Sequence, residues 1–257
     1  MSLLSNTYPI LEFDPSPTAI LSPQVTPLPE ASPKRAVLCF FQEVLQRLLA
    51  TGTLTPIGAL VSEIGPNPIY ALEHEESRVL VVHPGVGAAL AAGFLEELVA
   101  LGVDKFIACG GCGVLEKHIA AGYPLILTSA VRDEGTSYHY LPPGREAAAH
   151  PEAVAALEKV LQQRGVTYHL GKAWTTDGLY RETPARRDRR LAEGCSVVEM
   201  EAAAFFAVAQ FRKVVFGQVV YGGDLVVPEG WDKRAWSDRM DVRERLFWLA
   251  VEACGEL

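Results

Sequence analysis

Short runs of consecutive apolar residues alternate along the chain with longer segments in which apolar residues recur at helical spacing. The apolar runs are rich in β-branched side chains and have the length of buried strands. Strands are predicted at 35–41, 59–62, 69–72, 78–83, 105–109, 124–131, 167–177 and 214–221, and helices at 42–50, 88–101, 151–164 and 242–254. This alternation indicates an α/β fold around a largely parallel sheet that is covered on both faces.

One further segment is apolar at almost every position behind two carboxylates. It has the sequence Val-Val-Glu-Met-Glu-Ala-Ala-Ala-Phe-Phe-Ala-Val-Ala at 197–209. A helix that is apolar on nearly every side is expected to lie in the core. Glu199 and Glu201 would then lie at its N-terminal end, where the helix dipole favours negative charge. Side chains two positions apart on a helix point in different directions, so one carboxylate can brace the helix end while the other contacts a ligand.

By composition the chain divides into two parts. Residues 1–34 are proline-rich and show little periodicity, which predicts an extended arm on the surface of the protein or of a neighbouring subunit. Residues 35–257 carry all the predicted strands and helices, and are expected to form a single α/β domain of ordinary size.

Charge and cysteine content narrow the class of protein. The net charge is −8 and no run is rich in lysine or arginine, which argues against nucleic acid as a partner. No apolar run has transmembrane length and no signal-peptide pattern is present, so no membrane association is expected. The 5 cysteines suggest no disulfide framework, which favours the cytoplasm, and their spacing gives little support for a metal site.

Polar residues at the ends of predicted strands are candidates for ligand contacts, because ligand-binding groups gather there in α/β folds. Asp224 follows two glycines at such an end, a place that suits a ligand-binding Asp and a turn-forming Asp equally. Gly85-Val86-Gly87 follows another strand but matches only part of the dinucleotide-binding fingerprint. A nucleotide-cofactor oxidoreductase is therefore a distant alternative.

The string Val198-Glu199-Met200-Glu201-Ala202-Ala203-Ala204 resembles the signature of the nucleoside phosphorylase superfamily, in the branch that holds purine nucleoside phosphorylase, uridine phosphorylase and methylthioadenosine nucleosidase. The resemblance runs from about residue 78 to 254. It implies a three-layer α/β/α fold with a mixed, partly barrel-like central sheet, assembled as a homo-oligomer (dimer, trimer or hexamer). It also implies cleavage of the N-glycosidic bond of a nucleoside, the small-molecule partner.

The same resemblance implies roles for individual residues of the signature. Glu201 would bind the 2′- and 3′-hydroxyls of ribose and Met200 would pack on the sugar, with Glu199 beside them. Asp224 would act on the base, by protonating or hydrogen-bonding N7 of a purine as the glycosidic bond breaks.

Two other segments are similar to the family. Thr-Thr-Asp-Gly-Leu-Tyr at 175–180 matches a base-binding segment, which implies that Leu179 and Tyr180 line the base pocket. Thr183 and Ala185 stand where uridine-specific members carry a uracil-binding Gln and Arg, so a purine is favoured. His139 lies in a loop that approaches the family's active site or subunit contact, and is a candidate ligand contact beside the alternative of an exposed loop histidine.

The nucleophile is left open by these residues. The family's phosphate-binding turn carries an Arg and a Ser or Thr, where this chain has Ala108 and Gly111. A phosphorylase would have to hold inorganic phosphate, its co-substrate, in a region of backbone amides around Gly85, Gly110 and Gly111. A nucleosidase would need a carboxylate to activate water, for which Glu43 is the candidate, although an exposed helix-start carboxylate is the simpler interpretation. A nucleoside-binding protein without catalysis is the third hypothesis, and no cofactor is expected.

Overall fold

The computed structural model describes residues 6–75 and 77–257, and its strands form one sheet of 11 strands within that part of the chain. The strands are β1 (Arg35–Cys39), β2 (Thr55–Ser62), β3 (Gly65–His74), β4 (Ser77–Val82), β5 (Lys105–Val114), β6 (Pro124–Asp133), β7 (Glu146–Ala148), β8 (His169–Thr176), β9 (Cys195–Glu199), β10 (Val215–Val227) and β11 (Gly230–Asp232). The helices are α1 (Gln42–Ala50), α2 (Ala88–Ala100), α3 (Pro151–Gln163), α4 (Pro184–Ala192), α5 (Ala202–Arg212) and α6 (Met240–Gly255). Short 3₁₀ turns are η1 (Pro9–Leu11), η2 (Thr136–His139), η3 (Leu179–Arg181) and η4 (Trp236–Asp238).

At one end the sheet closes on itself. Its order is β11-β10-β6-β8-β9-β5-β1-β4-β3-β2, and β10 also pairs with β5, so that β10, β6, β8, β9 and β5 form a ring. Strand β8 is parallel to β6 and β9, whereas β9 is antiparallel to β5. The mixed, partly barrel-like sheet is confirmed. The expectation of a largely parallel sheet is wrong, because short connections make β2, β3 and β4 antiparallel neighbours.

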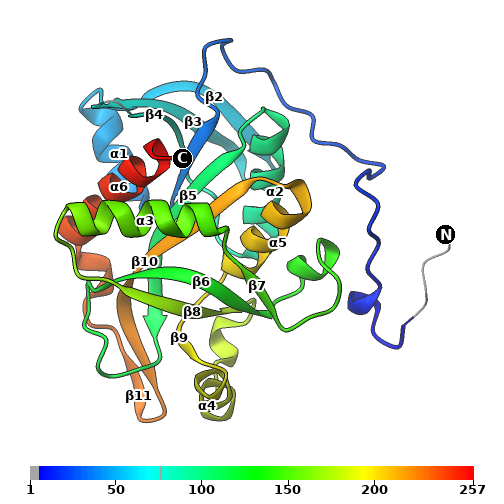
Figure 1. Ribbon diagram of the computed structural model, residues 1–257, viewed down its shortest axis with the longest axis vertical. Coiled ribbons are helices and arrows are strands. Elements are labelled where there is room, and N and C mark those ends of the chain that lie inside the picture. Colours follow the sequence, from blue (N-terminus) through cyan, green and yellow to red (C-terminus); the bar gives the residue numbers. More distant parts are fainter. Residues whose placement is uncertain (1–5, 76) are drawn as a thin grey trace.

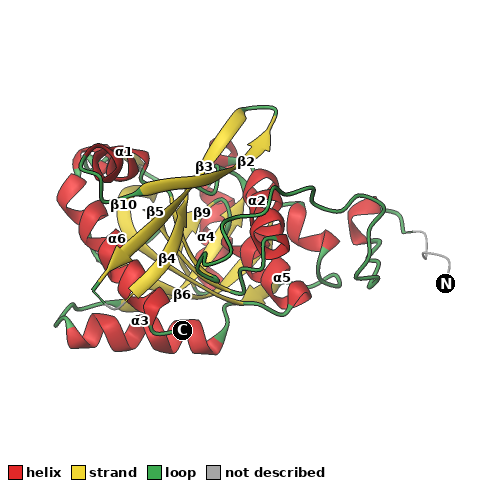
Figure 2. Cartoon of the chain, turned by 90° about the horizontal axis from the view of Figure 1, so that it is seen from above, coloured by secondary structure: helices red, strands yellow, loops and turns green. Residues whose placement is uncertain are grey.

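Helices cover both sides of the sheet (Figure 1, Figure 2). On one side α2 and α5 pack together, and Leu95 and Phe205 belong to the apolar cluster beneath them. On the other side α3 packs on α6 with α1 nearby, and Leu157 and Phe247 belong to a second cluster. Helix α5 is buried along its length from Ala202 to Ala209, as its all-round apolar sequence predicts.

Helix α4 is an element that the hydrophobic pattern does not predict. In its sequence Pro-Ala-Arg-Arg-Asp-Arg-Arg-Leu-Ala the apolar residues lie only at the two ends, with five consecutive charged residues between them. The hydroxyl of Thr183 caps the helix, and Arg186 and Arg190 both donate to Asp133 Oδ2, at 2.6 and 3.2 Å. Because capping and ion pairs hold this helix to the sheet, a search for apolar periodicity cannot find it.

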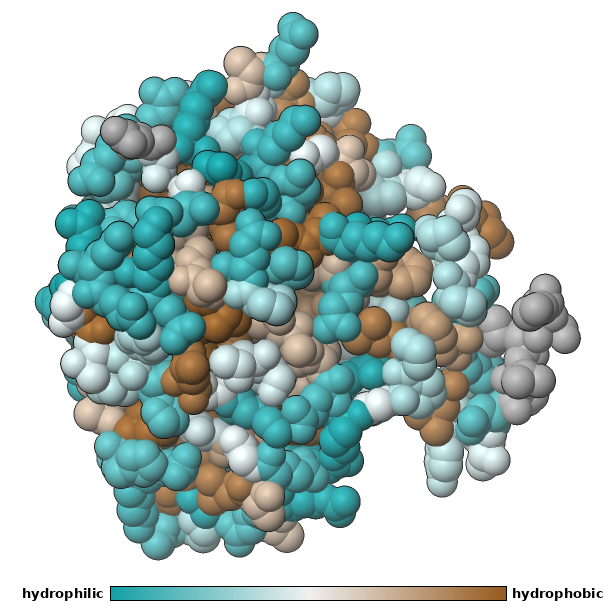
Figure 3. Space-filling model, in the orientation of Figure 1, coloured by the Kyte–Doolittle hydropathy of each residue, from teal (hydrophilic) through white to brown (hydrophobic). Residues whose placement is uncertain are grey.

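The arm that precedes β1 runs down the side of the molecule that carries α2 and α5 (Figure 1). In its described part, residues 6–34, η1 lies against η2 and the carbonyl of Pro17 accepts from Arg212 on α5 at 3.0 Å. Further along the arm, Leu28 packs against the apolar cluster that contains Leu95 and Phe205. The side chains of Ile20 and Leu21 are exposed, and the arm stands off the body in the space-filling view (Figure 3). Residues 1–5 of the predicted arm lie outside the described part of the chain.

Candidate active site

Glu199 accepts hydrogen bonds at the N-terminus of α5, the buried helix. Strand β9 ends at this residue, and its carboxylate Oε2 accepts hydrogen bonds from the backbone N–H groups of Glu201 and Ala202 at 2.8 and 2.7 Å. Its other oxygen accepts from the hydroxyl of Thr175 on β8, and that hydroxyl accepts in turn from the N–H of Ala203 at 3.0 Å. Glu199 therefore satisfies donors at the start of α5 and ties the helix to β8.

This arrangement predicts a large loss of stability for Glu199→Ala. The substitution leaves two backbone donors and a threonine hydroxyl buried without their acceptor, which is expected to lower the free energy of unfolding by about 2–4 kcal/mol. Denaturant unfolding gives the free energy of unfolding of this variant and of a control, Glu73→Ala, in which the replaced side chain is 74% exposed. A loss no greater than that of the control would contradict the bracing role.

Glu201 turns in a different direction, toward the segment that precedes α2. Its residue is only 6% exposed, and its Oε1 accepts from the backbone N–H of Gly87 at 2.6 Å. Burial raises the pKa of Glu201 to about 8, and the negative charge of Glu199 acts in the same direction. A ligand that donates hydrogen bonds to such a carboxyl stabilises its ionised form and lowers its pKa. Met200, between the two glutamates, is half-buried.

Asp224 lies in β10, on the other side of β5 from the glutamates. Its Oδ2 accepts from the indole N–H of Trp231 on β11 at 2.5 Å, and its residue is partly exposed. A Cβ built on Gly113 of β5 would lie 2.9 Å from Val198 and 3.7 Å from Asp224 Oδ1, so the side chain of Asp224 reaches across β5 toward β9. Burial raises the pKa of the Cys112 thiol, and the charges of Glu199 and Asp224 both add to this effect. The two carboxylates therefore flank the same stretch of β5.

A further carboxyl that the sequence did not single out lies near Asp224. Glu182 follows η3 and is partly buried, and burial together with the charge of Asp224 raises its pKa to about 7, against the opposing charge of Arg186. Its neighbours Leu179 and Tyr180 are 47% and 91% exposed. Neither of these side chains is enclosed in the single chain, so their contact with a base stays a prediction.

The glycines of β5 lie within a strand and not in a turn. The predicted strand end at 109 is wrong, because Gly110 and Gly111 pair with Val220 and Tyr221 of β10 and continue the ladder. Aromatic rings lie against both: a Cβ on Gly110 would be 3.0 Å from Phe40, and a Cβ on Gly111 would be 3.3 Å from Tyr221. The ring of Phe40 therefore lies beside Gly110, and the ring of Tyr221, whose hydroxyl accepts from Arg243 at 3.0 Å, lies beside Gly111.

The remaining candidates occupy different surroundings. Glu43, near the start of α1, forms an ion pair with Arg243 of α6, which also donates to the hydroxyl of Tyr221 at 3.0 Å. Arg243 therefore already occupies the Glu43 carboxylate, and a role for Glu43 in activating water stays a prediction. His139 is exposed on η2. Gly85 belongs to the segment that leads to Gly87 and α2.

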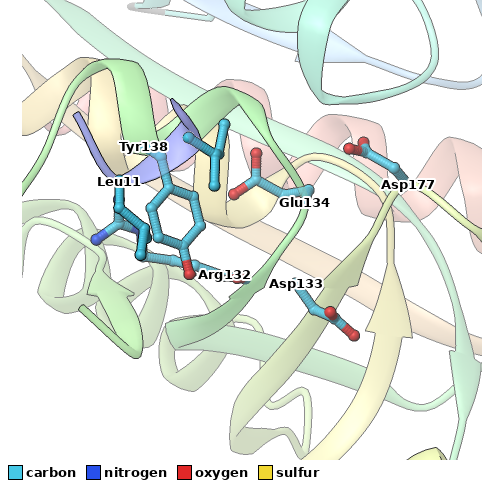
Figure 4. Close-up of a pocket in the computed structure, with 7 residues that line it drawn as sticks. Leu11, Arg132, Asp133, Glu134, Tyr138 and Asp177 are labelled. Carbon is cyan, nitrogen blue, oxygen red and sulfur yellow. Dashed lines mark hydrogen bonds between the residues drawn. The ribbon is translucent and has the colours of Figure 1, made fainter. Parts of the chain in front are cut away.

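A cavity of about 360 Å³ lies between the arm and the ends of β6 and β8 (Figure 4). Glu134 and Asp177 line it, and Leu11 of the arm lies beside the ring of Tyr138. The charge of Asp177 raises the pKa of both Glu134 and Glu201, after the larger effect of burial, so this cavity adjoins the glutamate site. Glu134 and Asp177 belong to two segments that resemble the family. They come close to each other because β6 pairs with β8.

The described residues contain no group of His, Cys, Asp and Glu side chains that could hold a metal ion. Nor is any helix within residues 6–75 and 77–257 long and apolar enough to cross a membrane.

Comparison with known proteins agrees with this fold. Residues 34–246 match the model of the phosphorylase superfamily, and the chain belongs to that family. A guanosine phosphorylase of Halorubrum lacusprofundi is 29% identical over 180 residues, which cover 70% of this chain and 74% of that protein. A uridine phosphorylase of Thermococcus kodakarensis is 37% identical over 102 residues, which cover 40% of this chain and 37% of that protein.

Solved structures support the fold at lower identity. A purine nucleoside phosphorylase from Toxoplasma gondii, in complex with immucillin-H, has a TM-score of 0.76 at 19% identity and covers 91% of this chain and 98% of its own. An AMP nucleosidase from Bacteroides thetaiotaomicron has a TM-score of 0.69 at 24% identity and covers 86% of this chain and 87% of its own.

Proposed function

We propose that the protein cleaves the N-glycosidic bond of a nucleoside, with a purine favoured as the base. The observation that carries this proposal is Glu201, a buried carboxyl that faces the Gly87 segment and whose ionised form would be stabilised by ligand hydroxyls that donate to it. A carboxylate can accept from both hydroxyls of a cis-diol, so Glu201 would bind ribose while Met200 packs on the sugar. The match to a guanosine phosphorylase over 74% of that protein's length adds support for a purine.

Asp224 would act on the base of the bound nucleoside. Cleavage of the bond leaves negative charge on the departing base, and a proton or hydrogen bond delivered to N7 stabilises that charge. Asp224 is held by the indole of Trp231 and lies across β5 from the segment that carries Glu201. Glu182 adds a second carboxyl whose pKa of about 7 allows it to keep a proton near Asp224.

The relatives' names favour phosphate as the nucleophile, but one feature of the structure favours water. The ring of Phe40 lies against Gly110 and offers a phosphate dianion no hydrogen bond or charge. The hydroxyl of Tyr221, near Gly111, already donates to the carbonyl of Trp236 at 2.8 Å and accepts from Arg243 at 3.0 Å. Hydrolysis is therefore the second candidate reaction.

Release of free base from a panel of nucleosides, measured with and without phosphate, tests the proposal. Release that depends on phosphate and forms a sugar 1-phosphate would establish phosphorolysis, whereas equal release without phosphate would establish hydrolysis. If the protein binds a nucleoside but releases no base under either condition, the proposed reaction is wrong and a binding function remains.

Nucleoside binding is expected to release protons at neutral pH. The pKa of about 8 means that Glu201 is mostly protonated in the free protein at pH 7, and ribose hydroxyls that donate to it favour the ionised form. Binding should therefore release up to about one proton per site and tighten as the pH rises toward about 8. Titration calorimetry in two buffers of different ionisation enthalpy measures the proton count. Equal release by Glu201→Gln, or uptake of protons by the parent protein, would contradict the assignment.

A further inference from the structure

The segment between β4 and α2 brings a backbone N–H to the ribose-binding carboxylate, and His83 is the side chain that organises it. His83 follows β4, and its imidazole Nδ1 accepts a hydrogen bond from the N–H of Gly85 at 3.1 Å. Gly85 and Gly87 both have positive φ angles, +78° and +91°, which only glycine adopts readily. The N–H of Gly87 then reaches Glu201 Oε1 at 2.6 Å.

Two neighbouring elements fix His83. Its carbonyl accepts from the side-chain amide of Asn67 on β3 at 2.7 Å, and its ring lies edge-on to Phe40 with 6.1 Å between the ring centroids. Burial lowers the pKa of His83, against the smaller opposing effects of the Phe40 carbonyl and the Glu43 carboxylate. The ring is therefore mostly neutral at neutral pH, and the hydrogen bond from Gly85 shows that Nδ1 is the unprotonated nitrogen.

We propose that His83 is a positioning residue for the nucleoside site: by accepting the Gly85 N–H, it holds residues 83–87 in the shape that presents the Gly87 N–H to Glu201. An acceptor that bonds the N–H two residues ahead forms the same short ring as an Asx turn. Without this acceptor, the backbone at Gly85 and Gly87 is free to change conformation before α2 begins. The N–H of Gly87 then no longer has a fixed direction. That Glu201 binds ribose rests on the proposed function, whereas the geometry around His83 does not.

The chemistry of the bond suggests matched variants. His83→Leu fills the space next to Phe40 but has no acceptor, whereas His83→Asn supplies an oxygen at the right distance along the chain to accept from Gly85. His118→Asn, at an exposed position, controls for the loss of a histidine. Thermal unfolding of all three shows whether each remains folded.

The expected result for His83→Leu is a rise of about tenfold in the KM for nucleoside, the equivalent of one lost hydrogen bond, with kcat changed by less than about threefold. His83→Asn is expected to stay within about twofold of the parent protein, because it restores the acceptor. An unchanged KM in His83→Leu, or an Asn variant as impaired as the Leu variant, would overturn the proposal.

Hydrogen exchange of the Gly87 amide provides a measurement that needs no activity. His83→Leu should speed this exchange by about tenfold, and His83→Asn should restore the protection. If the parent protein releases no base but Gly87 exchange follows this pattern, the proposed function fails and the positioning role stands. If Gly87 exchange is the same in all variants, the positioning role fails whatever the activity.

Discussion

Replacement of Glu201 by Ala is expected to lower kcat/KM for release of base by about 10²–10⁴-fold. The estimate follows from two hydrogen bonds between ribose hydroxyls and a buried carboxylate, each worth about 1.5–3 kcal/mol. Glu201 has the position for this role, because Glu199 already satisfies the donors at the start of α5 and leaves the second carboxyl free to face the Gly87 segment. Steady-state kinetics and titration calorimetry with the best nucleoside of the panel measure the loss.

Two variants show whether the loss is specific. Glu201→Gln keeps the shape of the side chain and an acceptor for the Gly87 N–H, but it lacks the charge and should retain more activity than the Ala variant. Glu63→Ala, at an exposed position on the loop after β2, should behave as the parent protein. Unchanged kinetics in a folded Glu201→Ala protein would remove the ribose-binding role.

The division of labour between the two glutamates could be predicted in outline from the sequence. Residues two positions apart at a helix start point in different directions, so one carboxylate was expected to brace the helix and the other to contact a ligand. The structure makes Glu199 the brace, although its grouping with the ribose-binding residues stays untested. Glu199 braces the helix together with Thr175, whose hydroxyl donates to its carboxylate. Thr175 reaches Glu199 through the pairing of β8 with β9, a contact that the local sequence does not reveal.

Other parts of the site depend on contacts that no local pattern reveals. In the sequence His83 is a polar residue at the end of an apolar strand. Its imidazole accepts from the N–H of Gly85 only in the folded turn that follows the strand. Glu182 belongs to no motif of the sequence, and its burial and the effect of the Asp224 charge on its pKa arise only in the folded chain. Long strands were also shortened in the prediction, since glycines such as Gly110 and Gly111 usually end a strand but here continue one.

The exposure of Tyr180 also has a physical explanation within the proposal. A side chain that is 91% exposed cannot shield a reacting bond from water in a single chain. A homo-oligomer with sites near its subunit contacts, as the family resemblance implies, would cover it. A neighbouring subunit would also cover apolar side chains of the arm that are exposed in the single chain, such as Ile20 and Leu21.

Replacement of Asp224 by Asn is expected to lower kcat by about 10²–10⁴-fold while the affinity for nucleoside changes by less than about tenfold. The amide keeps an oxygen that can accept from the Trp231 indole, so the local contact survives, but it cannot give a proton to the departing base. The effect should be largest for purine nucleosides whose bases leave poorly, because these depend most on protonation.

Asp232→Asn on the neighbouring strand β11 is the matched control, since that side chain is exposed and belongs to the same hairpin. It should leave both kcat and KM within about twofold of the parent values. If Asp224→Asn also retained purine turnover within about a factor of two, Asp224 would not be the acid, because loss of a general acid costs far more than that. Glu182, whose pKa of about 7 allows it to hold a proton close to Asp224, would then be the carboxyl to replace next.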